Sequence, residues 1–192
     1  MSHTTHAGSP RSTHSGVSLI IVLIFLAILS GLAITAMQGS GFAARIAGNE
    51  ADRNLSFQAA EAALRDAEYD IRNAIADGTS CVATSPCRAD LIYRGNGFDT
   101  DCPNGRCVPL AATATLQNWE VAANWNNAST KTVAYGSYTG AAALPVVSRQ
   151  PRYMLEYFKQ GDFAVYRITA IGFGANESTQ TILQSAIKAK QT

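Results

Sequence analysis

Residues 17–37 read VSLIIVLIFLAILSGLAITAM, a run of 21 positions without a charged side chain. Thirteen of these residues are Val, Leu, Ile or Phe. A helix of this length spans ~31 Å, which matches a hydrocarbon core about 30 Å thick. A buried core helix is normally shorter and has a polar face, and Ile34-Thr35-Ala36 is a poor cleavage site for a conventional signal peptide. The run therefore predicts a membrane anchor over residues 17–38.

The first 16 residues, MSHTTHAGSPRSTHSG, are polar and contain no large aliphatic side chain. Such a segment cannot contribute to a hydrophobic core, so we expect it to be disordered or removed. It holds all three histidines of the chain, His3, His6 and His14. The rest of the chain therefore lacks the commonest general base and the commonest metal ligand. We predict a protein that is not an enzyme, with no catalytic residues, no cofactor and no metal site.

The charges are nearly balanced, with 15 Lys and Arg residues against 14 Asp and Glu residues, and no block of five like charges occurs. Nucleic-acid binding needs a clustered basic surface, because contacts with phosphates dominate its affinity. We therefore expect no nucleic acid among the partners.

A second helical pattern follows the anchor and runs from about Asp52 to Ala76 within a segment that we place at residues 39–78. Gly39-Ser40-Gly41 and Gly48 can interrupt the helix before it, and Asp77-Gly78 is expected to end it. Its apolar positions recur at spacings of three and four, which is one stripe along a helix. The stripe consists of Phe57, Ala60, Leu64, Ala67, Ile71 and Ala74.

The four cysteines lie within 27 residues, at Cys81, Cys87, Cys102 and Cys107. An even number in a loop-rich stretch of an exported protein favours disulfides. Three pairings are possible, and we favour the local one, Cys81–Cys87 with Cys102–Cys107. The alternative is a zinc site with four thiolate ligands, but the chain lacks the C-x2-C pairs of such sites.

The last forty residues predict β-structure, whereas residues 79–150 predict a long irregular region with a short strand near 131–135. Residues 153–158 and 163–171 are rich in aromatic and branched side chains, with Gly161-Asp162 between them. A third strand is expected at 178–187, where alternate residues share one face. We predict an α+β fold, in which an antiparallel meander packs on the helix stripe and residues 79–192 form a globular domain.

Four stretches resemble type IV pilus assembly proteins of the PilX type. The amino-terminal half contributes GVSLIIVLIFLAIL (16–29) and RIAGNEADRNLSFQAAEAALRDAE (45–68). The carboxyl-terminal half contributes CPNGRC (102–107) and YRITAIGFGANESTQTILQSAI (166–187). The resemblance implies a type IV pilin-like fold, with a long amino-terminal helix packed on an antiparallel meander.

The same resemblance implies a maturation site. In type IV prepilins a prepilin peptidase cuts after a glycine that precedes the apolar run, and the new amine is methylated. Here that cut would fall between Gly16 and Val17, so residues 1–16 would be the leader. The implied location is the inner membrane, as a single-pass protein with a periplasmic carboxyl-terminal domain that is later incorporated into the extracellular pilus. The implied partners are the inner membrane, the peptidase, other minor pilins and the major pilin.

Ile21 departs from the pattern of most pilins, which carry a glutamate at the fifth residue of the mature chain. That glutamate is thought to pair with the terminal amine of a neighbouring subunit, whereas PilX-like minor pilins and the tip pseudopilin of type II secretion lack it. An ionised carboxylate in the bilayer costs about 2.5–3.5 kcal/mol, so an isoleucine eases insertion and removes the pairing. We therefore expect a minor pilin that primes a type IV pilus and sits at its tip, supporting twitching or adhesion.

Two other functions fit the same sequence. One is a tip pseudopilin of a type II secretion system, although those proteins are usually longer. The other is a tip adhesin that binds a surface ligand through exposed aromatic side chains such as Trp119 and Trp125. For those two tryptophans simple packing is the more common role.

Overall fold

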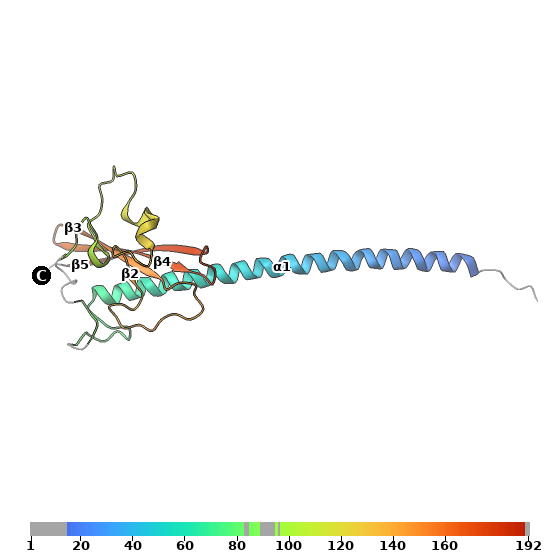
Figure 1. Cartoon of the computed structure of the whole chain (residues 1–192), viewed down its shortest axis with the longest axis horizontal. Helices are drawn as coiled ribbons and strands as arrows, with labels where there is room; N and C mark the ends of the chain where they lie inside the picture. The colour runs from blue at the N-terminus through green and yellow to red at the C-terminus, as the bar shows by residue number, and fades with distance from the viewer. Residues whose placement is uncertain (1–14, 83–84, 89–94, 96, 191–192) are drawn as a thin grey trace, which may run out of the picture. The chain divides into compact units, whose positions relative to one another are not determined.

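The computed structural model describes residues 15–82, 85–88, 95 and 97–190. Nearly all of the predicted leader, residues 1–16, lies outside this range. The chain divides into two compact units between Gly48 and Asn49. Helix α1, Ser15–Ile71, contributes residues to both units (Figure 1).

The helix in the first unit continues through Gly39-Ser40-Gly41 and Gly48, where the sequence allowed interruptions, and α1 is the long amino-terminal helix that was predicted. A glycine weakens a helix by about 1 kcal/mol but keeps its backbone N–H, so the hydrogen-bond ladder can pass through it. No proline lies within α1 to remove a donor.

Helix α1 ends at Ile71, before the predicted stop at Asp77-Gly78. Asn73 has a φ of 56°, and the N–H groups of Asn73 and Ala74 donate to the carbonyls of Asp70 (3.2 Å) and Tyr69 (2.9 Å). These two bonds close a Schellman motif, for which asparagine is the usual alternative to glycine. Gly78 instead serves the tight turn that follows the helix, with its N–H donating to the Ile75 carbonyl at 2.8 Å.

The sheet of the second unit has five strands in the order β1-β3-β4-β5, with β2 also pairing with β3. The three long strands form the predicted antiparallel meander, and Gly161, with a φ of 59°, lies in the turn between the first two. The unpredicted β1 runs parallel to β3. The strands are β1 (Arg106–Cys107), β2 (Val133–Ala134), β3 (Arg152–Gln160), β4 (Phe163–Phe173) and β5 (Gln180–Lys190).

The main core lies between the sheet and the carboxyl-terminal part of α1, which Figure 1 shows alongside the strands. The predicted stripe is confirmed at Ala60, Ala67 and Ile71, but Phe57 is 44% exposed. The helix instead presents small residues to β4, because Gly172 brings the strand backbone against the backbone of Ser56 and Ala60. The remaining core comes from Ala63, Val133, Tyr153, Leu155, Ala164, Tyr166, Ile168 and Ala170.

A second cluster, here called the outer-face cluster, covers the outer face of the sheet, which is the face opposite α1. The segment around Cys102 and Cys107 packs there with Trp125 on Met154, Ile171 and Phe173. Three short 3₁₀ helices build this covering layer: η1 (Pro103–Gly105), η2 (Asn118–Glu120) and η3 (Ala122–Trp125). The fold is therefore α+β with a helix on one sheet face and a loop-rich layer on the other.

Candidate functional site

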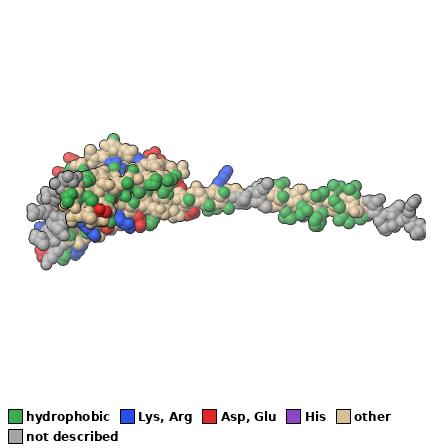
Figure 2. Space-filling view, turned by 90° about the horizontal axis from the view of Figure 1, so that it is seen from below, with side chains coloured by type: hydrophobic (Ala, Val, Ile, Leu, Met, Phe, Trp, Pro, Cys, Tyr) green, Lys and Arg blue, Asp and Glu red, His purple; other side chains and the backbone are tan. Residues whose placement is uncertain are grey.

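The amino-terminal part of α1 has the length and composition of a membrane-spanning helix over Gly16–Thr35. None of this segment is buried in the structure, and Figure 2 shows its hydrophobic side chains at the surface. Two of its hydroxyl groups are satisfied within the helix, since Ser30 donates to the Leu26 carbonyl (2.7 Å) and Thr35 to the Leu32 carbonyl (2.9 Å). This internal bonding lets polar side chains lie in an apolar environment.

The three residues predicted for maturation and assembly lie at the start of this segment. Gly16 is exposed, and a Cβ placed on it would meet no atom within 4 Å. Val17 is 65% exposed and Ile21 is 58% exposed. All three are helical. The helix therefore presents exposed apolar side chains at Val17 and Ile21.

The cysteines form two disulfides in the irregular region, Cys81–Cys87 and Cys102–Cys107. Their Cα atoms are 6.1 Å and 4.1 Å apart, respectively. Both Cys102 and Cys107 are fully buried in the outer-face cluster, whereas Cys81 and Cys87 are partly exposed. The sequence also allowed a zinc site, but here each sulfur is bonded to another sulfur.

Asp70 anchors the first disulfide loop to the helix. Its carboxylate forms a buried ion pair with Arg88, which follows Cys87, and accepts a hydrogen bond from the Tyr153 hydroxyl at 2.8 Å. Arg88 also donates to the Asn104 carbonyl at 2.6 Å. Burial raises the pKa of Tyr153 well above 10, so its hydroxyl remains a donor. One helical carboxylate thus joins the loop, the sheet and the CPNGRC loop.

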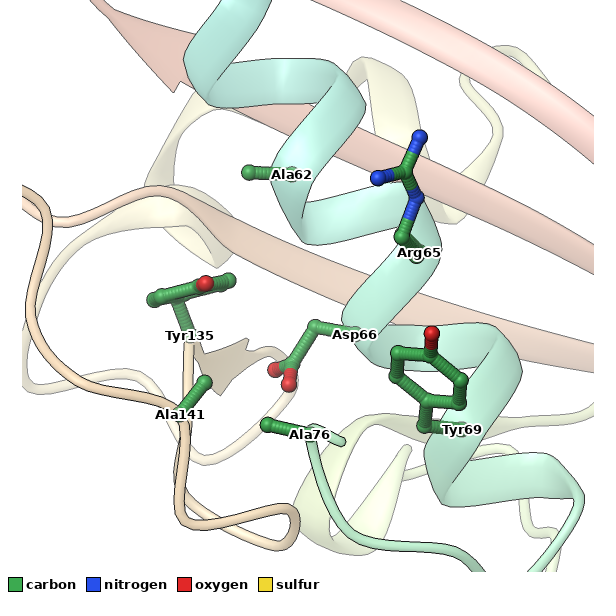
Figure 3. Close-up of a pocket in the computed structure, with 7 residues that line it drawn as sticks. All are labelled: Ala62, Arg65, Asp66, Tyr69, Ala76, Tyr135 and Ala141. Atoms are coloured by element: carbon green, nitrogen blue, oxygen red, sulfur yellow. The ribbon is translucent and has the colours of Figure 1, made fainter. Parts of the chain in front are cut away.

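Asp66 fastens a second loop and lines a hollow of about 240 Å³ (Figure 3). One carboxylate oxygen accepts the Gly136 N–H at 2.8 Å, and the other accepts the Thr139 hydroxyl. Because both oxygens already have donors, Asp66 holds the loop in place and does not suit the role of a general base. The residues that line the hollow are Ala62, Arg65, Asp66, Tyr69, Ala76, Tyr135 and Ala141.

Asp52 fastens the turn between β4 and β5. Its Oδ1 accepts the N–H groups of Ala175 (2.6 Å) and Asn176 (3.3 Å). A hydrogen bond from the Thr179 side chain lowers the pKa of this carboxyl most strongly. Asp52, Asp66 and Asp70 therefore use one helix to position three loops.

The anchoring roles of these three carboxylates were not predicted from the sequence. A signal was present for two of them, because Asp66 and Asp70 are four residues apart and flank Ala67 and Ile71 on the buried stripe. An acidic residue on a buried stripe needs a partner, since an unpaired buried charge is costly. The partners lie 18 to 83 residues away along the chain, which no local pattern reveals.

The two tryptophans proposed as adhesin contacts lie in the outer layer. Trp125 is only 4% exposed, and its indole N–H donates to the Trp119 carbonyl at 2.9 Å. Trp119 is partly buried against the same cluster. Packing accounts for Trp125, which is therefore not available as an exposed contact.

The helix has an exposed apolar amino-terminal part, and an α+β domain is built on its other part. These two features define a pilin-like subunit. Comparison with known families agrees: the PilX N-terminal model matches residues 15–65, and the model for the type IV pilus assembly protein PilX C-term matches residues 95–189. Together these matches span more than half of the chain, which belongs to the PilX family of type IV pilus assembly proteins. No curated protein and no solved structure matched it.

Membership of this family places the chain among components of pilus assembly, which work with other pilus components. The apolar amino-terminal helix suits membrane anchoring. The family is not a known enzyme class.

Proposed function

We propose that this protein is a minor pilin that primes assembly of a type IV pilus and caps the fibre. The proposal rests on Ile21, an exposed apolar side chain in the place of the usual glutamate. If maturation leaves Val17 at the amino terminus, Ile21 is the fifth residue of the mature chain.

A shaft subunit and a tip subunit differ in what they need at this position. In the shaft each terminal amine is buried beside a neighbouring subunit. Burying that charged amine without an acidic partner would cost about 3 kcal/mol or more. A subunit at the tip has no neighbour beyond it with which to pair. An isoleucine is therefore compatible with the tip and unfavourable throughout the shaft.

The proposed life cycle follows from this placement. The prepilin peptidase cleaves between Gly16 and Val17, and the anchor retains the protein in the inner membrane with its carboxyl-terminal domain in the periplasm. Other minor pilins then assemble with it, and the major pilin extends the fibre below them. The two disulfides suit an oxidising compartment such as the periplasm.

Quantitative mass spectrometry of sheared pili tests the proposal. We expect this protein at a small fraction of the major pilin, and we expect its deletion to reduce fibre number sharply while the major pilin remains in the membrane. Near-equal abundance of the two proteins would contradict a tip position. Normal piliation of the deletion strain would contradict a priming role.

A further inference from the structure

Strand β5 forms a long open edge of the sheet. All eleven of its residues pair with β4 on one side, in a ladder without a break from Gln180 to Lys190. Within the described part of the chain, no strand pairs with its other side. On the opposite side of the sheet, the described residues form only the two-residue strands β1 and β2 beside β3.

The hydrogen-bond pattern shows which backbone groups face this edge. The Gly174 N–H donates to the Thr179 carbonyl at 2.9 Å, which makes these residues a hydrogen-bonded pair at the start of the ladder. Hydrogen-bonded and non-bonded pairs alternate in antiparallel sheets, so the odd-numbered residues of β5 bond to β4. The even-numbered residues direct their N–H and C=O groups outward, and these are the exposed residues Gln180, Ile182, Gln184, Ala186 and Lys188.

This edge lacks the usual protection against pairing. Natural proteins protect exposed edge strands with charges, prolines or bulges. Residues 180–187 contain no charge and no proline, and the register with β4 shows no bulge. Ile182 is 46% exposed on the outer face. Lys188, the first charge, lies near one end of the edge.

A hollow of about 310 Å³ lies beside the edge on the outer face of the sheet. Ile171 and Ile182, which are cross-strand partners, and the tryptophans Trp119 and Trp125 contribute to its lining. A strand added next to β5 would place a side chain about 5 Å from Ile182 on the same face. A large apolar side chain at that position would reach the hollow.

We propose that β5 is a docking edge for an extended strand of another pilus subunit. The partner strand bonds to the outward N–H and C=O groups of β5, places an apolar side chain beside Ile182, and carries an acidic residue near Lys188. That lysine donates to the Gln160 side-chain oxygen (3.2 Å) and lies 4.2 Å from the centre of the Phe163 ring, but it has no ion-pair partner among the described residues. The identity of the partner as a pilus subunit rests on the proposed function.

A different subunit fits this edge better than a second copy of the same chain in the same orientation. If neighbouring copies had the same orientation, β5 of one copy would have to pair with the edge of the next copy that carries β1 and β2. Those strands have two residues each and cannot match an eleven-residue ladder. The structure therefore favours a partner that brings a long strand of its own.

Photo-crosslinking of the full chain in piliated cells tests the proposal. A photoreactive amino acid replaces Ile182, and in a matched control it replaces Val82, which is 65% exposed in the first disulfide loop. We expect an adduct with another pilus subunit from position 182 and none from position 82. Adding Ala186→Pro removes an outward N–H without touching the β4 ladder and should lower the adduct yield about tenfold.

Several outcomes would overturn the proposal: no adduct from position 182, an adduct only with a second copy of the chain, or an adduct with a protein outside the pilus. An adduct that Ala186→Pro leaves unchanged, at equal levels of folded protein, would exclude strand addition. The proposed function fails separately, if the deletion strain has normal pili. In that case an adduct with a pilus subunit would still support the docking edge.

Discussion

Gly172 determines how closely the sheet approaches the helix. A Cβ at this position would lie well inside contact distance of the Ser56 carbonyl oxygen and the Ala60 backbone nitrogen. On the helix side, Ala59, Ala60 and Ala63 are almost fully buried. Small side chains on one element and a glycine on the other let two backbones touch, which larger residues would prevent.

Gly172→Ala should therefore destabilise the protein by about 2–4 kcal/mol, because backbone atoms cannot move aside as a flexible side chain can. Thermal unfolding of the full chain in detergent measures the effect. Gly48→Ala is the matched control, since a Cβ there meets nothing within 4 Å and alanine favours a helix. An unchanged melting temperature for Gly172→Ala would show that the close approach does not contribute to stability.

Asp66 should make stability depend on pH in a definite direction. Burial raises the pKa of this carboxyl above its ordinary value of 3.8, despite hydrogen bonds from Thr139 and Gly136 that lower it. Between 3.8 and the raised pKa, the folded protein binds a proton that the unfolded chain has lost. The contribution of Asp66 to stability therefore falls as pH rises through that window.

Asp66→Asn should remove this pH dependence while keeping the loop attached, because the amide oxygen still accepts one hydrogen bond and the Thr139 hydroxyl can donate or accept. We expect a cost below about 1.5 kcal/mol at neutral pH, against about 2–4 kcal/mol for Asp66→Ala, which leaves two donors unpaired. Urea unfolding at several pH values measures both. Equal costs for the two variants would contradict the anchoring role.

Asp52 should affect stability in a lower pH range than Asp66. The pKa of its carboxyl is lowered, so its contribution to stability is lost only as pH falls below 3.8.

At the scale of elements, the two disulfides close loops of similar length but sit in different surroundings. Cys102–Cys107 lies in the buried outer-face cluster, whereas Cys81–Cys87 is partly exposed. Closing a short loop contributes about 2–3 kcal/mol in the chain-entropy model. Only for the buried pair does opening the bond also disturb a packed cluster.

Replacing both Cys102 and Cys107 with serine should therefore lower the level of folded protein more than replacing both Cys81 and Cys87. The loss should exceed about 3 kcal/mol for the buried pair, because two hydroxyls then lie in an apolar cluster. Protease resistance of the full chain measures the folded fraction. An equal effect of the two double variants would contradict the role of the buried cluster.

The presence of both disulfides can be checked by mass. The intact mass without reductant should be about 4 Da below the reduced mass, ~1 Da for each thiol hydrogen lost.

The elements with regular periodicity could be predicted from the sequence, whereas the elements set by distant contacts could not. Aromatic and branched residues located β3 and β4, and the alternation of residues on one face located β5. The helix end was missed because Asn73 closes a Schellman motif six residues after Ala67, while the more obvious Gly78 serves the next turn. Strand β1 was missed because it has only two residues and its pairing with β3 spans about fifty positions.

For the candidate site, the sequence located what depends on composition. The apolar run and the position of Ile21 can be read directly, because a membrane-spanning helix is specified by length and lack of charge. The open edge of β5 and the hollow beside it could not be read, because they depend on strand order and on which loop covers the outer face. The anchoring roles of Asp66 and Asp70 were hidden for the same reason.

On the scale of the whole molecule, maturation determines what the apolar helix can do. The polar first 16 residues and the uncharged run meet between Gly16 and Val17. Removing residues 1–16 would leave an amine next to an apolar segment, as a subunit that enters a fibre requires. Retaining them would keep a polar extension with Arg11 attached to that segment.

We therefore predict that the protein isolated from membranes or sheared pili begins at Val17, and amino-terminal sequencing checks this. Gly16→Asp should leave the leader attached without lowering the amount of protein in the membrane, because the apolar run of residues 17–37 is unchanged. The uncleaved protein should then be absent from sheared pili. Val22→Ala is the matched control, since it changes the anchor but not the junction and should be processed normally. A mature chain that began after Ala36 would mean that the apolar run is a signal peptide, and the anchor interpretation would fail.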